Sequence, residues 1–185
     1  LGLPARYRIE SIGPERQVLR DIVIGDPTRP DLTIERVEAE ITLRWGVPAI
    51  GRITLVRPRL YGSYRAGKLS FGSLDPLLFT GSKEPFRLPD LDLAIADGRG
   101  LLESDAGPVG LKIDGKGALR DGFAGTLAAV APQAALGNCR ATQASLYGQI
   151  TVRSEKPRFS GPLRLASLAC PDAALALGAS GMQVD

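Results

Sequence analysis

Alternating apolar and polar residues over positions 31–67 predict two long β-strands joined by a tight reversal. From Leu32 to Trp45, aliphatic side chains alternate with Thr, Glu and Arg, and a period of two places the two kinds on opposite faces of a strand. The alternation slips once, at Arg36-Val37, as a β-bulge would cause. A second alternating run extends from Arg52 to Tyr64, with a slip at Val56. Such strands form a sheet with one apolar face, and whatever covers that face decides the function.

The composition extends the β interpretation to the rest of the chain. The 185 residues are 44% hydrophobic but only 5% aromatic, and the 22 Gly and 14 Pro suit many turns between strands better than a helical bundle. We expect further strands at residues 5–12, 17–24, 69–71, 91–95, 101–104, 109–119, 123–131, 135–140, 144–153, 158–169 and 173–177. The sequence therefore predicts an all-β, mainly antiparallel protein, built as an elongated twisted sheet.

One short helix is expected near residues 75–79. Asp75 is a favourable capping residue, and Pro76 suits the first helical position because its missing N–H would be unpaired there. The apolar residues Leu77 to Phe79 are expected to plug an open end or edge of the sheet, with a docking surface as the alternative. We interpret residues 1–185 as a single β-rich segment, with a sub-boundary near 80–88 between an N-terminal hairpin region and a C-terminal meander.

The residues that most enzymes use are missing or lack the context that chemistry requires. Histidine, the commonest general base and metal ligand, does not occur. Asp90 and Asp92 fit the solvent side of an amphipathic strand, and Gly115-Lys116-Gly117 lacks the strand–loop–helix context of a phosphate loop. The net charge of +3 is spread along the chain, which is not typical of nucleic-acid binding. We expect no enzyme activity, no catalytic residues, no cofactor, no metal site and no nucleic-acid partner.

The two cysteines, Cys139 and Cys170, are too far apart in sequence for a metal-binding motif. In an oxidising compartment they can form a disulfide, which would stabilise the fold by about 3–4 kcal/mol. In a reducing compartment they would remain two buried thiols. We favour the disulfide, because Pro171 indicates a turn beside Cys170. The chain contains no apolar run of the roughly 18 residues that span a bilayer. It begins without Met, so we expect a segment of a longer protein.

A family resemblance is carried by four segments: IVIGDP (22–27), PDLTIERV (30–37), ITLVRPRLYG (53–62) and GKLSFGSLD (67–75). Together they resemble the YdbH-type branch of the AsmA-like family of bacterial envelope proteins, over roughly residues 5–80. The resemblance implies an open hydrophobic β-groove that crosses the periplasm within an inner-membrane-anchored protein. It implies phospholipid as the ligand, carried by its acyl chains between inner and outer membrane, and inner- and outer-membrane proteins or lipoproteins as partners.

If the groove is present, its lining is expected to be aliphatic. The predicted lipid-binding residues are Ile34, Val37, Ala39, Ile41, Leu43, Ile53, Leu55, Leu60, Leu91, Leu93 and Ile95. Arg57 and Arg59 are the predicted headgroup contacts, although exposed charges on a strand also discourage aggregation.

Two other functions remain open. One is a scaffold that assembles outer-membrane β-barrel proteins by strand addition at an open edge, near Arg57 or Tyr61. The other is a closed β-sandwich binding module whose core is made of the same aliphatic residues. Periodicity does not separate these alternatives, because an open and a closed sheet have the same alternation.

Overall fold

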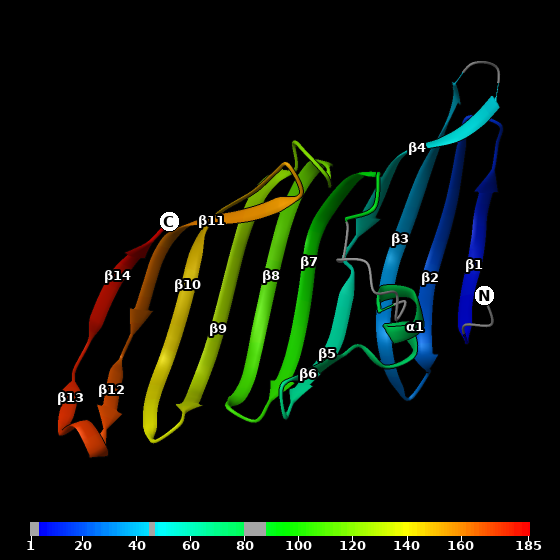
Figure 1. The fold of residues 1–185 in the computed structure, drawn as a ribbon. Coiled ribbons are helices and arrows are strands. Elements are labelled where there is room, and N and C mark those ends of the chain that lie inside the picture. The colour runs from blue at the N-terminus through cyan, green and yellow to red at the C-terminus, as the bar shows by residue number, and fades with distance from the viewer. Residues whose placement is uncertain (1–3, 45–46, 80–87) are drawn as a thin grey trace.

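The computed structural model describes residues 4–44, 47–79 and 88–185, and most of them lie in one 14-stranded sheet (Figure 1). The first six strands are β1 (Ala5–Ile12), β2 (Arg16–Asp26), β3 (Arg29–Arg44), β4 (Val47–Val56), β5 (Arg59–Arg65) and β6 (Lys68–Ser70). The others are β7 (Asp92–Ser104), β8 (Gly107–Ala118), β9 (Ala124–Leu136), β10 (Cys139–Arg153), β11 (Lys156–Leu165), β12 (Ser167–Cys170), β13 (Leu175–Leu177) and β14 (Ser180–Val184). The predicted all-β fold with one short helix is confirmed.

Most neighbouring strands are antiparallel, and the exception is at β7. Both β4 and β5 pair with β7 in parallel, so that Leu55 lies beside Ile95 and Leu60 lies beside Gly100. The strands β4 and β5 therefore follow one another along the same line of the sheet, as the alternation over residues 52–64 predicted. A parallel pair needs a long connection, and here the connection contains β6 and the helical segment.

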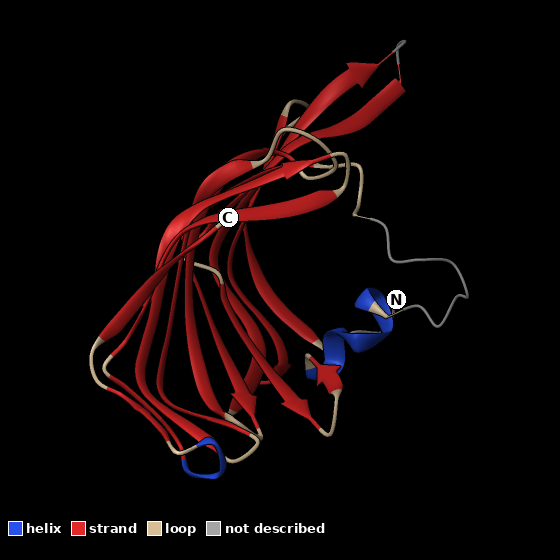
Figure 2. Ribbon diagram, turned by 60° about the vertical axis from the view of Figure 1, so that its left-hand side comes forward, coloured by secondary structure: helices blue, strands red, loops and turns tan. Residues whose placement is uncertain are grey.

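The sheet curls into a trough, seen from its side in Figure 2. Asp21, Arg57 and Asp97 have left-handed backbone conformations, with φ of 51°, 50° and 51°. The register places them at one level across β2, the β4–β5 junction and β7. The register of β7 against β8 shifts at Asp97, whose N–H donates to the Asp114 carboxylate at 2.7 Å. Because bulges bend strands and increase their twist, this line contributes to the curvature.

The predicted phase slip at Arg36-Val37 is present in two strands. Ile34 pairs with Ile22, and Val37 pairs with Leu19, so apolar residues of β2 and β3 remain opposite one another on both sides of the slip. The two strands change phase together, which keeps the apolar face of the sheet continuous.

The helical segment is a 3₁₀ turn, η1 (Gly72–Leu74), followed by α1 (Asp75–Leu78). The prediction that Asp75 caps the helix was wrong by one position, because Leu74 is the N-cap and Asp75 is the first helical residue. The Asp75 carboxylate instead accepts hydrogen bonds from the Ser70 hydroxyl, at 2.6 Å, and from the Phe71 N–H. It therefore fixes the turn that leads into the helix.

Two other expectations concern where the chain is interrupted, one by a turn and one by a sub-boundary. The single strand expected at 135–140 does not exist, because Gly137, with φ of 61°, turns the chain between β9 and β10. Residues 80–87, where the sub-boundary near 80–88 was predicted, lie outside the described residues, and that division stays a prediction.

Few apolar side chains are buried. Those of the described residues are Val18, Ile22, Ile34, Leu74, Phe123, Ala141, Val152 and Cys170. The described residues contain no second sheet packed on the first, so the structure does not show the closed sandwich. A disulfide joins Cys139 of β10 to Cys170 of β12. In the same described part of the chain, no helix has the length and hydrophobicity needed to cross a bilayer.

Candidate functional site

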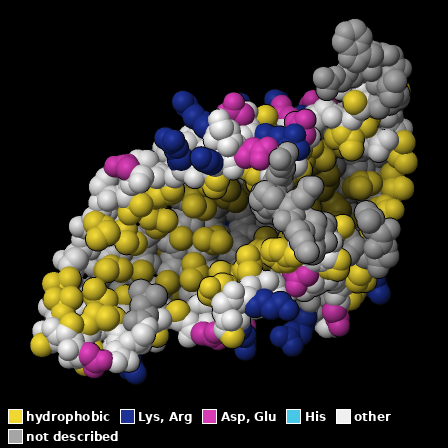
Figure 3. Space-filling view, in the orientation of Figure 1, with side chains coloured by type: hydrophobic (Ala, Val, Ile, Leu, Met, Phe, Trp, Pro, Cys, Tyr) yellow, Lys and Arg dark blue, Asp and Glu magenta, His cyan; other side chains and the backbone are white. Residues whose placement is uncertain are grey.

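The concave face of the sheet is a hollow lined mainly by aliphatic side chains, with charged residues at its rims (Figure 3). Cross-strand register explains this pattern, because directly paired residues point to the same face of a sheet. Two rows at the centre are Val37–Leu55–Ile95 and Ala39–Ile53–Leu93. The consecutive strands β3 and β4 and the distant strand β7 thus contribute apolar side chains to one surface.

Most of the other predicted lining residues belong to the same face. Leu60 pairs with Leu32, and Ile34 pairs with Ile22. Ile41 pairs with Ile50. Leu91 precedes β7 and accepts a backbone hydrogen bond from Leu119 at 2.9 Å. The side chain of Leu43 lies outside the described part of the structure. The structure brings the described residues together, while lipid binding by them stays a prediction.

The concave face continues beyond β7 over β8, β9, β10 and β11, where no lining residue was predicted. One row crosses the sheet as Leu60–Gly100–Leu111–Ala129–Leu146–Leu163. A second row includes Ile113 and Leu127. The alternation of Val109, Leu111 and Ile113 in the sequence was the one signal that pointed to them. The sequence did not show that these strands extend the same face as β3 and β4.

The convex face carries the ion pairs of the sheet. They include Arg16–Glu38, Arg36–Glu38, Arg20–Glu10, Arg57–Glu35, Arg52–Asp92 and Lys112–Asp97. The hydrogen bond from Arg20 lowers the pKa of Glu10, and the hydrogen bond to Asp92 raises the pKa of Arg52. These exposed pairs contribute little stability individually, but they keep one face of the sheet in water.

Arg57 and Arg59, the predicted headgroup contacts, lie on this convex face. The guanidinium of Arg57 pairs with Glu35 at 2.6 Å. Arg59 is paired in register with Arg99 and alternates with Leu60 of the trough. Neither side chain shares a face of the sheet with the predicted lining, so a headgroup held by them would be outside the trough. Their role stays a prediction.

The helical segment lies on the concave side, against β2 and β3 (Figure 2). Leu74 is buried, and the Asp31 carboxylate accepts hydrogen bonds from the N–H and hydroxyl of Ser73 at 2.9 and 2.6 Å. Gly62 of β5 makes room for Phe71, because a Cβ at this position would be 2.7 Å from the ring. Leu77, Leu78 and Phe79 remain exposed. The segment therefore adds apolar surface to one part of the trough.

The described residues contain no cluster of His, Cys, Asp and Glu side chains that fits a metal ion. What the trough offers is apolar surface without directional contacts. A family model described as intermembrane phospholipid transport protein YdbH matches residues 1–184. The chain belongs to the YdbH-like family. No curated protein and no solved structure shows a significant match to it.

Membership confirms the resemblance drawn from the sequence and extends it. The four segments covered roughly residues 5–80, whereas the YdbH-like match includes the whole C-terminal meander. The family is one of intermembrane phospholipid transport.

Proposed function

We propose that the concave face shields the acyl chains of phospholipids that move between the inner and outer membranes. The observation that best supports this proposal is the aliphatic concave face, which no second sheet of the described structure covers. Soluble proteins rarely leave a contiguous apolar surface exposed, and such surfaces usually mark binding sites. An alkyl chain is the ligand whose chemistry matches this surface.

The physical basis is burial without fixed contacts. Each methylene removed from water contributes about 0.8 kcal/mol, and this contribution does not depend on direction. Because the lining consists of similar aliphatic side chains, a bound acyl chain loses little binding free energy when it shifts by one residue along the trough. A polar headgroup needs water, which remains accessible at the open mouth.

The location follows from the same proposal. A trough that carries lipid between two membranes lies in the periplasm, as part of an inner-membrane-anchored protein that is longer than this segment. The disulfide between Cys139 and Cys170 suits this compartment, because disulfides persist where the environment is oxidising. Proteins of the two membranes are the partners that such a carrier requires at its ends.

Lipid extraction from the intact protein tests the proposal. We expect phospholipid in the purified protein by mass spectrometry, and a several-fold loss in a Leu55→Asp, Leu93→Asp variant. The control is Thr54→Asp, Ala94→Asp, which places the same charges on the convex face of the same two strands. Equal lipid content in the two variants would contradict the proposal.

One observation supports the second function, a scaffold that binds partner strands. Among the described strands, β1 pairs only with β2, and it is exposed along its length, so one of its edges has unpaired backbone groups. Arg57 and Tyr61, where capture was predicted, lie between β3 and β7 instead. Cross-linking of an outer-membrane β-strand peptide at Tyr7 of β1 but not at Tyr61 would support the scaffold, and no cross-link at Tyr7 would exclude capture at this edge.

A further inference from the structure

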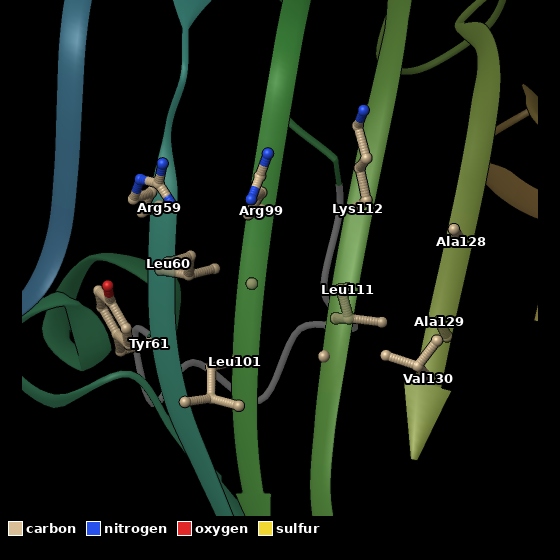
Figure 4. Close-up of a pocket in the computed structure, with 12 residues that line it drawn as sticks. Arg59, Leu60, Tyr61, Arg99, Leu101, Leu111, Lys112, Ala128, Ala129 and Val130 are labelled. Atoms are coloured by element: carbon tan, nitrogen blue, oxygen red, sulfur yellow. The ribbon is translucent and has the colours of Figure 1, made fainter. Parts of the chain in front are cut away.

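The convex face contains a shallow groove that runs across the strands (Figure 4). Its volume is about 480 Å³, and residues of β5, β7, β8 and β9 line it. The groove is separate from the trough. The row Leu60–Gly100–Leu111–Ala129 belongs to the concave face. The residues directly before and after each member of this row point to the opposite, convex face, and they form the walls of the groove.

The two walls of the groove differ in chemistry. One wall is a row of cations, because Arg59, Arg99 and Lys112 are paired in register across three strands. The other wall is apolar and contains Tyr61, Leu101 and Val130, which are 39%, 40% and 53% exposed. Exposed apolar side chains in register beside a row of positive charge are suited to an amphipathic ligand with a negative charge.

The cationic wall is only partly neutralised. Asp97 lies 3.6 Å from Arg99 and 3.4 Å from Lys112, so a single carboxylate serves both cations, with Asp114 at 4.0 Å from Lys112. No ion pair joins Arg59 to a carboxylate of the described residues. Arg59 is therefore the cation with the most capacity for an anionic group, and a guanidinium can bind a phosphate through two hydrogen bonds.

The dimensions of the groove limit its occupant. The two walls stand two residues apart along each strand, about 6.7 Å, and the four strands extend over about 14 Å. A helix, about 10 Å across with its side chains, does not fit between the walls. Only a single extended chain does.

The floor of the groove distinguishes a peptide from an alkyl chain. It is made of backbone in the middle of the sheet, where the N–H and C=O groups already bond to neighbouring strands. A peptide in the groove would gain no backbone hydrogen bonds of the kind that strand addition supplies. An alkyl chain needs none.

We propose that this outer groove binds one molecule of an anionic phospholipid, with an acyl chain along Tyr61, Leu101 and Val130 and the phosphate at Arg59, beside the rest of the cationic wall. The site goes beyond the proposed trough and does not depend on it. It gives Arg59, a predicted headgroup contact, a place on the outer face of the protein.

Photo-cross-linking in the intact protein tests this site. The photoreactive residue p-benzoylphenylalanine replaces Tyr61, and the probe is a soluble short-chain phosphatidylglycerol. Arg158 of β11, an exposed position of the same convex face outside the groove, is the matched control position. We expect labelling at Tyr61 that is at least fivefold stronger than at Arg158, and weaker labelling by the zwitterionic phosphatidylcholine of the same chain length. Equal labelling at the two positions would overturn the proposal.

Variants separate charge from shape. We expect Arg59→Gln, Lys112→Gln to reduce labelling at least fivefold, and Arg158→Gln, an exposed cation of β11 on the same face, to leave it unchanged. Gly110→Val fills the apolar wall next to Val130 and should reduce labelling by both lipids, at an unchanged unfolding midpoint. If Gly110→Val fails to fold, the charge variants still decide the result.

Three further results would overturn the proposed site. They are an equal effect of Arg158→Gln, competition by inorganic phosphate as strong as by the lipid, and stronger labelling of an acidic peptide than of the lipid. Lipid co-purified with the trough is measured in the same variants. It should be unchanged by Arg59→Gln, Lys112→Gln, so that failure of the outer groove and failure of the trough are distinguishable.

Discussion

Leu55 of β4 and Ile95 of β7 are direct neighbours in a parallel strand pair, although β5, β6 and α1 lie between them in the chain. This pairing joins the N-terminal hairpin region to the C-terminal meander within one sheet. It places both residues on the concave face with Val37. The apolar trough therefore depends on a long-range pairing, and each half of the chain supplies part of its lining.

The strands after β7 should contribute to lipid binding as much as the predicted residues do. Leu127→Asn places an amide in the trough, and we expect several-fold less retained phospholipid, since each methylene left in water costs about 0.8 kcal/mol, about fourfold in affinity. Thr126→Asn is the control, because Thr126 points to the convex face beside Asp114. Lipid extraction and mass spectrometry measure the effect, and equal retention would exclude Leu127 from the lining.

The alternation of the sequence was sufficient to predict the faces of individual strands. Val37, Leu55 and Leu93 were assigned to one face from period-two alternation, and the register agrees. The same reasoning did not select Leu111, Leu127 or Leu146, because alternation shows which residues share a face of one strand. It does not show which strands are neighbours or on which side the sheet curves.

The parallel pairing at β7 could not be predicted from local pattern. Residues 91–95 and 101–104 looked like separate strands because of Gly98 and Gly100, yet residues 92–95 and 101–104 both belong to β7. A Cβ at Gly98 would be 2.6 Å from the Ile95 side chain, so glycine is required where the bulge brings both positions to one face. The glycine that resembled a turn is part of the bend that shapes the trough.

The disulfide should stabilise the C-terminal edge of the sheet. Cys139→Ser, Cys170→Ser is expected to lower the free energy of unfolding by about 3–4 kcal/mol, because the cross-link restricts the unfolded chain between β10 and β12. Denaturant titration measures this change. A reductant should destabilise the natural protein and leave the double variant unaffected, and a natural protein insensitive to reductant would contradict a stabilising disulfide.

The convex ion pairs predict a loss of stability in acid. The hydrogen bond from Arg20 lowers the pKa of Glu10, and hydrogen bonds from Thr28 lower that of Asp26. Desolvation alone would raise the pKa of Asp97, but the nearby cations Lys112 and Arg99 have the larger combined effect, so the pKa of Asp97 is lowered. A lowered folded-state pKa means stabilisation above the ordinary value near 4 that is lost as the pH falls through the folded-state value.

Thermal unfolding between about pH 6 and pH 2 measures this dependence. We expect the unfolding temperature to decrease once the pH is below about 4. The decrease should be smaller in Arg20→Gln, where Glu10 has lost the hydrogen bond that lowers its pKa. A midpoint that rises on acidification, or a steeper fall in the variant, would show that these carboxylates do not stabilise the folded sheet.

The helical segment should detach without loss of the sheet. Gly62→Ala adds a Cβ 2.7 Å from the Phe71 ring, which must then move. We expect faster hydrogen exchange in residues 71–78 and unchanged protection in β8 and β9. Gly178→Ala is the control, because no atom lies within 4 Å of a Cβ there. Slower or unchanged exchange in residues 71–78 would show that Phe71 does not hold the segment in place.

The most direct test of the trough compares neighbouring residues on opposite faces in the intact protein. Photoreactive residues replace Leu55, Leu93 and Leu127 in one set and Thr54, Ala94 and Thr126 in the other, and lipid adducts are identified by mass spectrometry. We predict phospholipid adducts in the first set and at least fivefold fewer in the second, because only the first set lines the concave face. Equal labelling of the two sets, or adducts confined to the second, would contradict an apolar trough for acyl chains.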